Sequence, residues 1–340
     1  MQNALLVNEK QAEFTLATRP IPQAGAGEVL VKIRAASLNA VDWKAQKYGF
    51  LYKEYPAVLG CDVAGDVVAV GEGVTGFSVG DRIFGPSLPY PDYSAYQEYC
   101  KLNVDWVAKI PETITYEQAS TFPCALNAAY QGLYNNAPYG MALTPLVPNG
   151  RDKSVGEAIL VIGGGSSVGQ FVIQLAKASG FSHIITTASS KHTDKLKELG
   201  ATHIIDRSIP LNSIQTKLVE IIGGGIKYIF DAISESETQK AAFDLLSPGG
   251  KLNIVLAPHV PMDSEEKKVT LTYGTADAPH YSAGVKTLFG GIGTLIEDGT
   301  LKPCNVEIVP GGLGAIVGGL KRLENNEISG VKLVVHPSDQ

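Results

Sequence analysis

A short apolar strand that runs directly into a glycine-rich turn is the feature that most restricts the fold of this chain. Residues 159–169 read Ile-Leu-Val-Ile-Gly-Gly-Gly-Ser-Ser-Val-Gly, and a helix is predicted from Gln170 to Ser179. A dinucleotide pyrophosphate binds at such a turn, because the backbone can approach it only where side chains are absent and because the amides of the helix N-terminus point outward. The segment therefore predicts an α/β unit that binds a nicotinamide cofactor.

The turn departs from the usual G-x-G-x-x-G spacing at its middle position. Counted back from Gly169, the first glycine falls on Gly164 and the middle position on Ser166, so the motif reads G-x-S-x-x-G. A string of this kind also occurs as a tight turn that only packs a strand against a helix. The surrounding pattern favours the cofactor site, and the predicted contacts come from Gly164, Ser166, Ser167, Val168 and Gly169.

That pattern continues as alternating strands and helices. The predicted elements are the strand His183–Ala188, the helix Thr193–Leu199, the strands Thr202–Ile205 and Lys227–Ala232, the helix Glu235–Leu246, a turn at Ser247–Gly250 and the strand Lys251–Leu256. Such a rhythm is typical of a six-stranded doubly wound sheet, whose ligand lies at the carboxyl ends of the strands. Val255 and Leu256 lie at such an end and are expected to face the nicotinamide half of the cofactor.

The end of the second strand indicates which cofactor binds. Enzymes specific for NAD carry an Asp or Glu about 20 residues beyond the turn, where it accepts hydrogen bonds from the ribose 2′-hydroxyl. Here the segment reads Thr-Ala-Ser-Ser-Lys-His at 187–192, with no carboxylate before Asp194. We therefore expect NADPH, with the 2′-phosphate held by Ser189, Ser190 and Lys191 and with Arg207 as a further arm. For Ser190 and His192 the alternative is nearly as strong, namely that they are solvated loop residues without a role in cofactor binding.

Composition limits the remaining possibilities. A chain of 340 residues normally forms two domains, and no apolar run approaches the roughly 18 residues of a membrane span. The chain has 34 acidic and 28 basic residues, and it lacks the basic stripe that is typical of a nucleic-acid-binding protein. The four cysteines form no paired spacing, and the N-terminus lacks a basic leader. We expect a cytoplasmic protein that binds neither nucleic acid nor membrane.

The segments outside the cofactor unit are a β-rich body and a mixed C-terminal part. Strands are predicted at Gly27–Ala35, Val63–Val70 and Asp81–Phe84, and helical structure at 111–134. Residues 135–156 are rich in proline and glycine and are predicted to be irregular. The last predicted elements are the helices Tyr281–Gly299 and Gly311–Asn325 and the strand Val331–Val335.

Several further motifs together resemble one family. They are Leu-Asn-Ala-Val-Asp-Trp-Lys at 38–44, Leu-Gly-Cys-Asp-Val-Ala-Gly at 59–65, Val-Gly-Glu-Gly-Val at 70–74, Gly-Asp-Arg-Ile-Phe-Gly at 80–85, the turn at 163–169, Leu-Gly-Ala at 199–201 and Ser-Gly-Val-Lys-Leu at 329–333. The chain resembles the zinc-independent branch of the medium-chain dehydrogenase/reductases, which contains quinone oxidoreductases and enoyl reductases. Its proline-rich connection and its Ser-Ser-Lys-His loop are most similar to fungal trans-acting enoyl reductases of polyketide synthesis.

The resemblance implies an α/β fold in which a Rossmann domain with a doubly wound parallel sheet is inserted into a GroES-like catalytic domain. Residues 1–125 would form the GroES-like domain, 126–282 the NADPH-binding domain, and 283–340 the segment that returns to complete the catalytic domain. Related alcohol dehydrogenases carry Cys in place of Asn39 and His-Glu in place of Cys61-Asp62. Because zinc needs at least three protein ligands, we expect no metal, although a distorted site that recruits Cys124 is conceivable.

The same resemblance assigns roles within the predicted site. Without a metal, hydride addition to a C=C bond conjugated to a carbonyl is favoured over alcohol oxidation, because the conjugated carbonyl spreads the developing charge. The proton would come from Tyr48, the first candidate, from Tyr52, the second, or from water, and these tyrosines equally suit a pocket lid. Lys44 would reach the nicotinamide ribose or the substrate carbonyl, unless it is a surface lysine. The other residues expected near the cofactor are Asn39, Asp42, Asn127, Val331 and Lys332.

Three functions remain open from the sequence. The first is an NADPH-dependent reductase of an enoyl thioester or an enone, whose substrate is a small molecule or is tethered to a carrier. The second is a quinone reductase, and the third a non-catalytic, crystallin-like relative that retains the fold. Asn127 would face the nicotinamide or else be a helix-surface amide.

Family members of these kinds are monomers or homodimers.

Overall fold

The computed structural model describes residues 1–147, 150–210, 213–262, 264–272 and 276–339. The chain divides into two compact units. The first consists of Met1–Cys124, Thr275–Glu297 and Pro303–Gln340, and the second of Ala125–Gly274 and Asp298–Lys302. Among the helices of the described residues, none combines the length and the apolar character that a bilayer crossing requires.

The first unit is built on two β-sheets. A seven-stranded sheet has the order β15-β16-β3-β5-β6-β8, and β7 pairs with the other part of β3. A smaller sheet has the order β2-β1-β4. The strands are β1 (Gln2–Val7), β2 (Phe14–Arg19), β3 (Glu28–Ser37), β4 (Ala57–Val58), β5 (Asp62–Val70), β6 (Arg82–Pro86), β7 (Tyr99–Asn103), β8 (Ala108–Lys109), β15 (Asn305–Ile308) and β16 (Val331–Val335). The C-terminal strand β16 thus completes a sheet begun by the N-terminal part of the chain, as the resemblance to a GroES-like domain implies.

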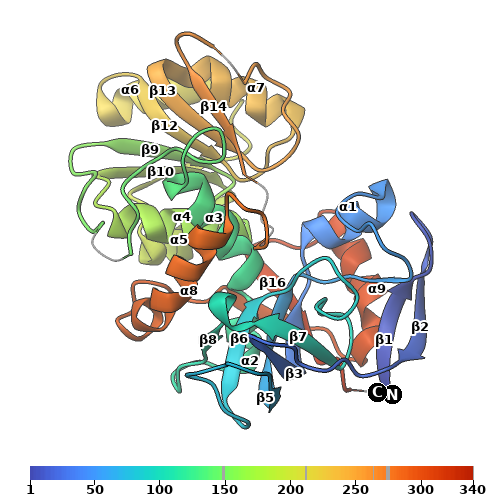
Figure 1. The fold of residues 1–340 in the computed structure, drawn as a ribbon. Coiled ribbons are helices and arrows are strands. Elements are labelled where there is room, and N and C mark those ends of the chain that lie inside the picture. The colour runs from blue at the N-terminus through green and yellow to red at the C-terminus, as the bar shows by residue number, and fades with distance from the viewer. Residues whose placement is uncertain (148–149, 211–212, 263, 273–275, 340) are drawn as a thin grey trace. The chain divides into compact units, whose positions relative to one another are not determined.

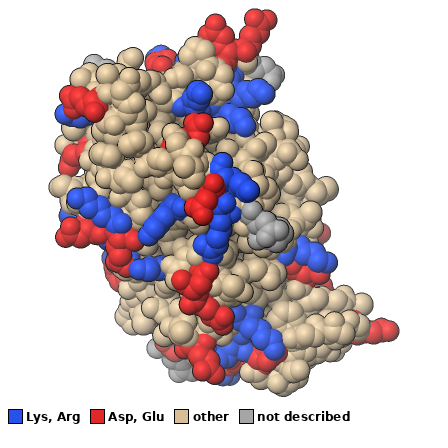
Figure 2. Space-filling model, turned by 90° about the vertical axis from the view of Figure 1, so that its left-hand side faces the viewer, with Lys and Arg blue, Asp and Glu red and all other residues tan. Residues whose placement is uncertain are grey.

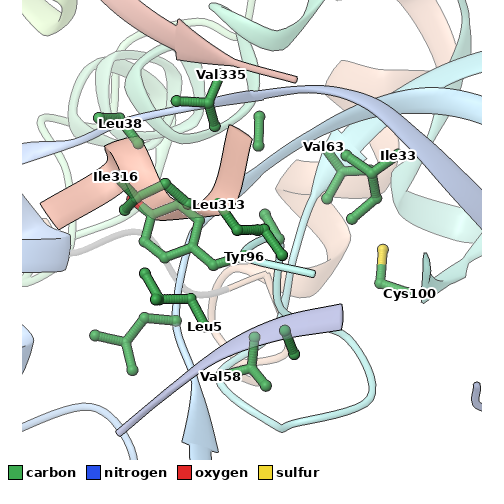
Figure 3. Close-up of a cluster of buried hydrophobic side chains, with 14 of the residues drawn as sticks. Leu5, Ile33, Leu38, Val58, Val63, Tyr96, Cys100, Leu313, Ile316 and Val335 are labelled. Atoms are coloured by element: carbon green, nitrogen blue, oxygen red, sulfur yellow. The ribbon is translucent and has the colours of Figure 1, made fainter. Parts of the chain in front are cut away.

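The core of this unit lies between the sheets and the helix α9 (Gly312–Glu324). Leu313, Ile316 and Leu320 recur at helical spacing on α9 and are buried. Figure 3 shows Leu313 and Ile316 together with Leu38 and Tyr96. The other helices are α1 (Ala40–Tyr48), α2 (Tyr116–Ser120), α8 (Ser282–Glu297) and the 3₁₀ helix η1 (Val104–Trp106).

The second unit contains the predicted doubly wound sheet. Its six parallel strands have the order β11-β10-β9-β12-β13-β14. They are β9 (Ala158–Ile162), β10 (His183–Ala188), β11 (His203–Asp206), β12 (Ile226–Asp231), β13 (Leu246–Ile254) and β14 (Lys268–Leu271). The order reverses at β9, so the switch point, where ligands bind in such sheets, coincides with the glycine turn.

Helices cover both faces of this sheet, with α4 and α5 on one side and α6 and α7 on the other (Figure 1). The strands β9 and β10 are buried on both faces, which explains the continuous apolar sequence of β9. The helices are α3 (Pro123–Tyr134), α4 (Ser167–Ala178), α5 (Thr193–Leu199), α6 (Ile214–Ile222), α7 (Ser236–Leu245) and the 3₁₀ helix η2 (Ser190–His192).

Several predicted elements needed correction. The helical stretch 111–134 is two helices, α2 and α3, because Pro123 starts a new helix after Ser120. The turn at Ser247–Gly250 is an irregularity within β13: Leu246 pairs with Ile226 and Lys251 with Tyr228, so the intervening residues bulge out of the ladder. Elements that were not predicted include α6, β14 and β15. The described residues of 135–156 contain neither helix nor strand, as expected.

Charged side chains are mixed on the surface. On the face shown in Figure 2, Lys and Arg side chains lie beside Asp and Glu side chains. Examples of such pairs in the second unit are Arg151 with Asp298 at 2.7 Å and Lys302 with Glu198 at 2.8 Å. The mixture agrees with the nearly balanced charge of the sequence.

Candidate active site

The glycine turn joins β9 to α4 and is held by its own hydrogen bonds. Gly163 adopts a left-handed backbone conformation with φ of 82°. Ser166 is the N-cap of α4: its Oγ accepts a hydrogen bond from the Gly169 amide at 3.0 Å and donates one to the Gly163 carbonyl at 2.8 Å. This capping explains why serine replaces the middle glycine of the motif, since serine is a preferred N-cap.

Close packing leaves no room for a side chain at the third glycine of the motif, Gly169. A Cβ on Gly169 would lie 2.3 Å from the Gly163 carbonyl oxygen, a backbone atom that cannot rotate away. We expect Gly169→Ala to lower the free energy of unfolding of the second unit by about 1 to 3 kcal/mol, the usual cost of overpacking, and to weaken binding of NADPH. The measurement is hydrogen exchange of the β9 and α4 amides, together with a nucleotide titration.

A matched control for this variant is Gly165→Ala. A Cβ there would lie 3.3 Å from the His192 ring, and that side chain can move. Protection of the β9 and α4 amides should therefore be close to that of the parent protein in Gly165→Ala. If the β9 and α4 amides of Gly169→Ala are protected as well as those of the parent, the close approach of α4 to the turn is not the reason for glycine at position 169.

The predicted 2′-phosphate loop follows the carboxyl end of β10. Ser189 leads into η2, and the Arg207 amide donates to the Ala188 carbonyl at 2.9 Å, which places Arg207 beside that strand end. The side chains of Lys191 and Arg207 are exposed. Burial, and then the nearby charges of Lys191 and Arg207, lower the pKa of His192, so the two cations lie close to this ring. The arrangement gathers positive charge next to the glycine turn.

One carboxylate of this region was missed from the sequence. Asp206 ends β11, and the parallel register pairs it with Ala188 of β10. Its Oδ1 accepts hydrogen bonds from the amide of Ser208 at 2.8 Å and from the hydroxyl of Ser208 at 2.7 Å, and these, together with hydrogen bonds from Ser190, lower its pKa. The sequence spacing alone could not reveal it, because its position depends on strand pairing. Ser190 is thus a partner of Asp206.

Asn127 is placed differently from the helix-surface alternative. It lies in α3 and has no exposed area. Its Oδ1 accepts a hydrogen bond from the side-chain Nε2 of Gln131 at 3.2 Å, whereas its Nδ2 has no hydrogen-bond partner among the described residues. A buried amide donor without an acceptor calls for an explanation, such as an ordered water or a bound group. At the ends of β12 and β13, the Val255 amide donates to Ser234 Oγ at 2.8 Å, and Leu256 follows.

The predicted residues of the first unit meet in a buried polar cluster. We define it by Asn39, Asp42, Cys61, Asp62, Cys124 and Lys332. Lys332 is 2% exposed, and its Nζ lies 2.8 Å from Asp62 Oδ2 and 2.8 Å from Asn39 Oδ1. Asn39 Nδ2 donates to the same Asp62 oxygen at 2.9 Å, and the amide of Cys124 donates to Asp62 Oδ1 at 2.7 Å.

Four segments of the chain supply this cluster. Asn39 is the N-cap of α1, Asp62 begins β5 directly after Cys61, Cys124 lies in the first turn of α3, and Lys332 comes from β16. Burial lowers the pKa of Lys332, but the neighbouring Asp62 carboxylate and the Cys124 side chain more than compensate and raise it. The ammonium therefore stays charged. Val331 precedes it in β16 and is half-buried. The ion pair itself was not predicted.

Asp42 forms the second half of the cluster. Its Oδ2 accepts hydrogen bonds from the Tyr96 hydroxyl at 2.7 Å and from the Asn39 amide at 2.8 Å, and its Oδ1 accepts one from the Cys61 thiol at 3.4 Å. Burial raises the pKa of Asp42 to about 6, even though the Tyr96 and Asn39 hydrogen bonds oppose the shift. Asp42 thus changes its charge just below neutral pH.

We expect this carboxyl to make the first unit less stable as the pH rises. Its pKa is higher in the folded chain than in the unfolded chain, so the stability it contributes is complete below the unfolded pKa and is lost as the pH rises through the folded pKa of about 6. Asp42→Asn keeps an oxygen acceptor without the charge. The variant should exceed the parent by on the order of 2 kcal/mol near pH 8 and equal it near pH 4.

The measurement is urea unfolding followed by tryptophan fluorescence. Both tryptophans, Trp43 and Trp106, belong to the first unit, so the signal reports on that unit alone. A difference between Asp42→Asn and the parent that is the same at both pH values would show that Asp42 does not titrate as described.

The two candidate tyrosines have opposite environments. Tyr52 is 7% exposed, and burial together with Cys61 and Asp42 raises its pKa well above the ordinary value, so its phenol keeps its proton beside the polar cluster. Tyr48 ends α1 and is 59% exposed, with its ring 6.2 Å from that of Trp43. Lys44 lies on the same helix with its ammonium 5.5 Å from the Trp43 ring. The structure thus brings Tyr52, and not Tyr48, to the cluster.

Comparison with known proteins identifies the family of this chain. Residues 25–112 match a family model described as an alcohol dehydrogenase GroES-like domain, and residues 167–277 match one described as a zinc-binding dehydrogenase. A dehydrogenase of Aspergillus niger is 32% identical, over 98% of this chain and 98% of the relative. A trans-enoyl reductase of Aspergillus japonicus is 30% identical, over 92% of this chain and 90% of the relative.

Among solved structures, a mycobacterial protein in complex with NADPH has a similar fold. The two superpose with a TM-score of 0.78 and 24% sequence identity, over 99% of this chain and all of the other. At that identity the likeness concerns the fold alone.

Proposed function

This chain belongs to the medium-chain dehydrogenase/reductase family, and on that basis we propose that it is an NADPH-dependent reductase of an activated C=C bond. The substrate class would be an enoyl thioester or an enone. The observation that carries the proposal is the gathering of Lys191, His192 and Arg207 beside the glycine turn, which suits a phosphorylated ribose. The naming of a similar protein as a trans-enoyl reductase supports the substrate class.

The residues present fit a bound nicotinamide cofactor. The turn from Gly163 to Gly169 would hold the pyrophosphate through backbone amides, and Ser189 and Lys191 would hold the 2′-phosphate. The buried Nδ2 of Asn127 lacks an acceptor in the described chain, and a carboxamide oxygen of the nicotinamide would supply one. When bound, NADPH supplies the hydride. Val255 and Leu256 would line the same end of the sheet.

Zinc, which the name of one matched family model implies, does not fit the polar cluster. Within the described residues no group of three or more His, Cys, Asp or Glu side chains is arranged to hold a metal ion. Asp62 is engaged by the Lys332 ammonium at 2.8 Å, and the Cys61 thiol donates a hydrogen bond to Asp42. A cation already neutralises the carboxylate where a metal would be needed. We therefore derive no step through zinc.

The first unit would supply the proton and stabilise developing charge. As the substrate accepts hydride at its β-carbon, negative charge spreads onto the conjugated oxygen, and hydrogen-bond donors nearby lower the barrier. Tyr52 is our preferred proton donor, because its buried phenol stays protonated at neutral pH and lies beside the cluster. Lys44 would contact the substrate carbonyl or the nicotinamide ribose. Tyr48, the first candidate from the sequence, becomes the second.

Turnover of NADPH tests the proposal directly. We expect oxidation of NADPH with an α,β-unsaturated thioester or a small enone, and slower oxidation of NADH. Prior dialysis against a strong chelator should leave the rate unchanged, because no metal takes part. Reduction of quinones alone would favour a quinone reductase, and no turnover with any acceptor would favour a non-catalytic relative. Loss of activity on chelation, restored by zinc, would contradict the proposed chemistry.

The remaining assignments are also proposals. We expect a cytoplasmic protein that acts as a monomer or a homodimer, on a free small molecule or on a chain tethered to a carrier. Neither nucleic acid nor a membrane is expected as a partner.

A further inference from the structure

Asp206 is a carboxylate that the second sheet places beside the predicted 2′-phosphate loop. The parallel register sets it opposite Ala188, the last residue of β10, and the next amide, of Arg207, donates to the Ala188 carbonyl at 2.9 Å. Neighbouring strands lie about 4.8 Å apart, so the Asp206 backbone is one strand spacing from the point where the loop begins. Asp206 is half-buried and is therefore accessible to a ligand.

The strand order β11-β10-β9 indicates which part of a bound dinucleotide reaches Asp206. In the proposed function the pyrophosphate lies at the glycine turn after β9, and the 2′-phosphate lies after the adjacent strand β10. The 2′-phosphate and the base are carried by neighbouring carbons of one ribose. In the same direction across the carboxyl ends of the strands, the next strand is β11, which ends at Asp206. The base is thus expected beside this carboxylate.

We propose that Asp206 selects adenine as the base of the cofactor, by accepting a hydrogen bond from its exocyclic amino group. The proposal rests on the proposed function, because it adds a specificity-determining residue to the same nucleotide site. Adenine carries an amino donor at carbon 6, whereas guanine and hypoxanthine carry a carbonyl oxygen there. An ionised carboxylate only accepts hydrogen bonds, so it attracts the amino group and repels the carbonyl oxygen.

The residues after β11 hold this carboxylate ionised and in place. Its Oδ1 accepts hydrogen bonds from the amide of Ser208 at 2.8 Å and from the hydroxyl of Ser208 at 2.7 Å. These two hydrogen bonds are the main cause that lowers the pKa of Asp206, so the group is an acceptor at neutral pH. Because both are made by Oδ1, we assign Oδ2 to the base. Ser190 has a smaller effect on this pKa, and its hydroxyl can rotate towards a bound phosphate.

The affinity for NADPH alone would not isolate the contact with the base. Removing the Asp206 charge takes an acceptor away from the amino group, but it also relieves a repulsion of the 2′-phosphate, and the two effects oppose each other. Deamino-NADPH carries hypoxanthine in place of adenine and has the same phosphate. The ratio of the dissociation constants of deamino-NADPH and NADPH therefore reports on the base.

Fluorescence titrations of the full chain with both nucleotides measure this ratio. We expect the parent protein to bind NADPH at least about tenfold more tightly than deamino-NADPH, which is the discrimination of one hydrogen bond to a charged group. In Asp206→Ala the ratio should fall to near one. In Asp206→Asn it should also be near one, because an amide can accept from an amino group or donate to a carbonyl oxygen.

Asp194→Asn is the matched control for these variants. Asp194 is an exposed carboxylate in the first turn of α5, in the same unit, and its replacement should leave the ratio unchanged. Circular dichroism verifies that the variants fold. Asp206→Asn is the safer of the two in this respect, because it keeps an oxygen for the Ser208 amide and hydroxyl.

Two results would overturn the assignment of Asp206. They are equal binding of the two nucleotides by the parent protein, and a preference for NADPH that persists unchanged in the Asp206 variants. A parent protein that binds neither nucleotide would contradict the proposed function itself, so the two failures are distinguishable.

Discussion

Replacing Lys332 by methionine is expected to lower the free energy of unfolding of the first unit by about 3 to 5 kcal/mol, because it leaves a buried carboxylate without its partner ion. Asp62 has no exposed area and accepts hydrogen bonds from Lys332, Asn39 and Cys124. A set of three donors around one side chain suits only a charged or strongly polar acceptor. Methionine matches the length of the lysine stem and removes the charge. Urea unfolding followed by tryptophan fluorescence measures the loss.

The matched control removes the charge from both partners. Asparagine at position 62 still offers an oxygen to the Cys124 amide but carries no charge that must be neutralised. Lys332→Met combined with Asp62→Asn should therefore regain most of the lost stability, since removing a whole buried pair costs far less than removing one ion. If Lys332→Met alone lowers the free energy of unfolding by less than about 1 kcal/mol, Asp62 is not buried as an ion.

The second large effect concerns the cofactor. Replacing both Lys191 and Arg207 by alanine is expected to raise the dissociation constant of NADPH at least about a hundredfold, because hydrogen bonds to a charged group contribute about 1.5 to 3 kcal/mol each. Binding of NADH should change little, because NADH has no 2′-phosphate. A fluorescence titration with both nucleotides measures the two constants, and the effect on NADPH should weaken at high salt.

Lys197→Ala is the matched control for this pair. Lys197 is an exposed lysine of α5, in the same part of the second unit, but lies outside the predicted phosphate loop. Its replacement should leave both dissociation constants near those of the parent. If the double variant weakens NADH and NADPH by the same factor, the loop contributes only general positive charge and the preference for NADPH must be abandoned.

The doubly wound sheet could be predicted from the sequence because its signals are local. The strand, the turn with Gly164 and Gly169 and the following helix lie within a few residues of one another, and the central strand β9 is a continuous apolar run. The edge strand β14 was missed, because a short strand that is paired on one side only leaves little pattern. α6 was missed although it has an apolar face, because the prediction passed directly from the third strand to the fourth.

The candidate site could be predicted only in part from the sequence, for a different reason. Asn39, Asp42 and Lys332 were singled out through resemblance, but the ion pair of Lys332 with Asp62 joins strands from opposite ends of the chain. Sequence spacing carries no information about such a contact. Asp206 likewise approaches Ser190 only through the pairing of β10 with β11. The sequence ranked Tyr48 before Tyr52, whereas the structure buries Tyr52 beside Asp42, because burial depends on the orientation of the residues after α1.

The central claim is hydride transfer to a C=C bond, and deuterium labelling tests it most directly. NADPH carrying deuterium at the transferable position of the nicotinamide would be incubated with the protein and an α,β-unsaturated thioester. We predict a saturated product with deuterium at the β-carbon, and with solvent hydrogen at the α-carbon. Deuterium at the carbonyl carbon of an alcohol product, or no labelled product while NADPH still binds, would contradict the account.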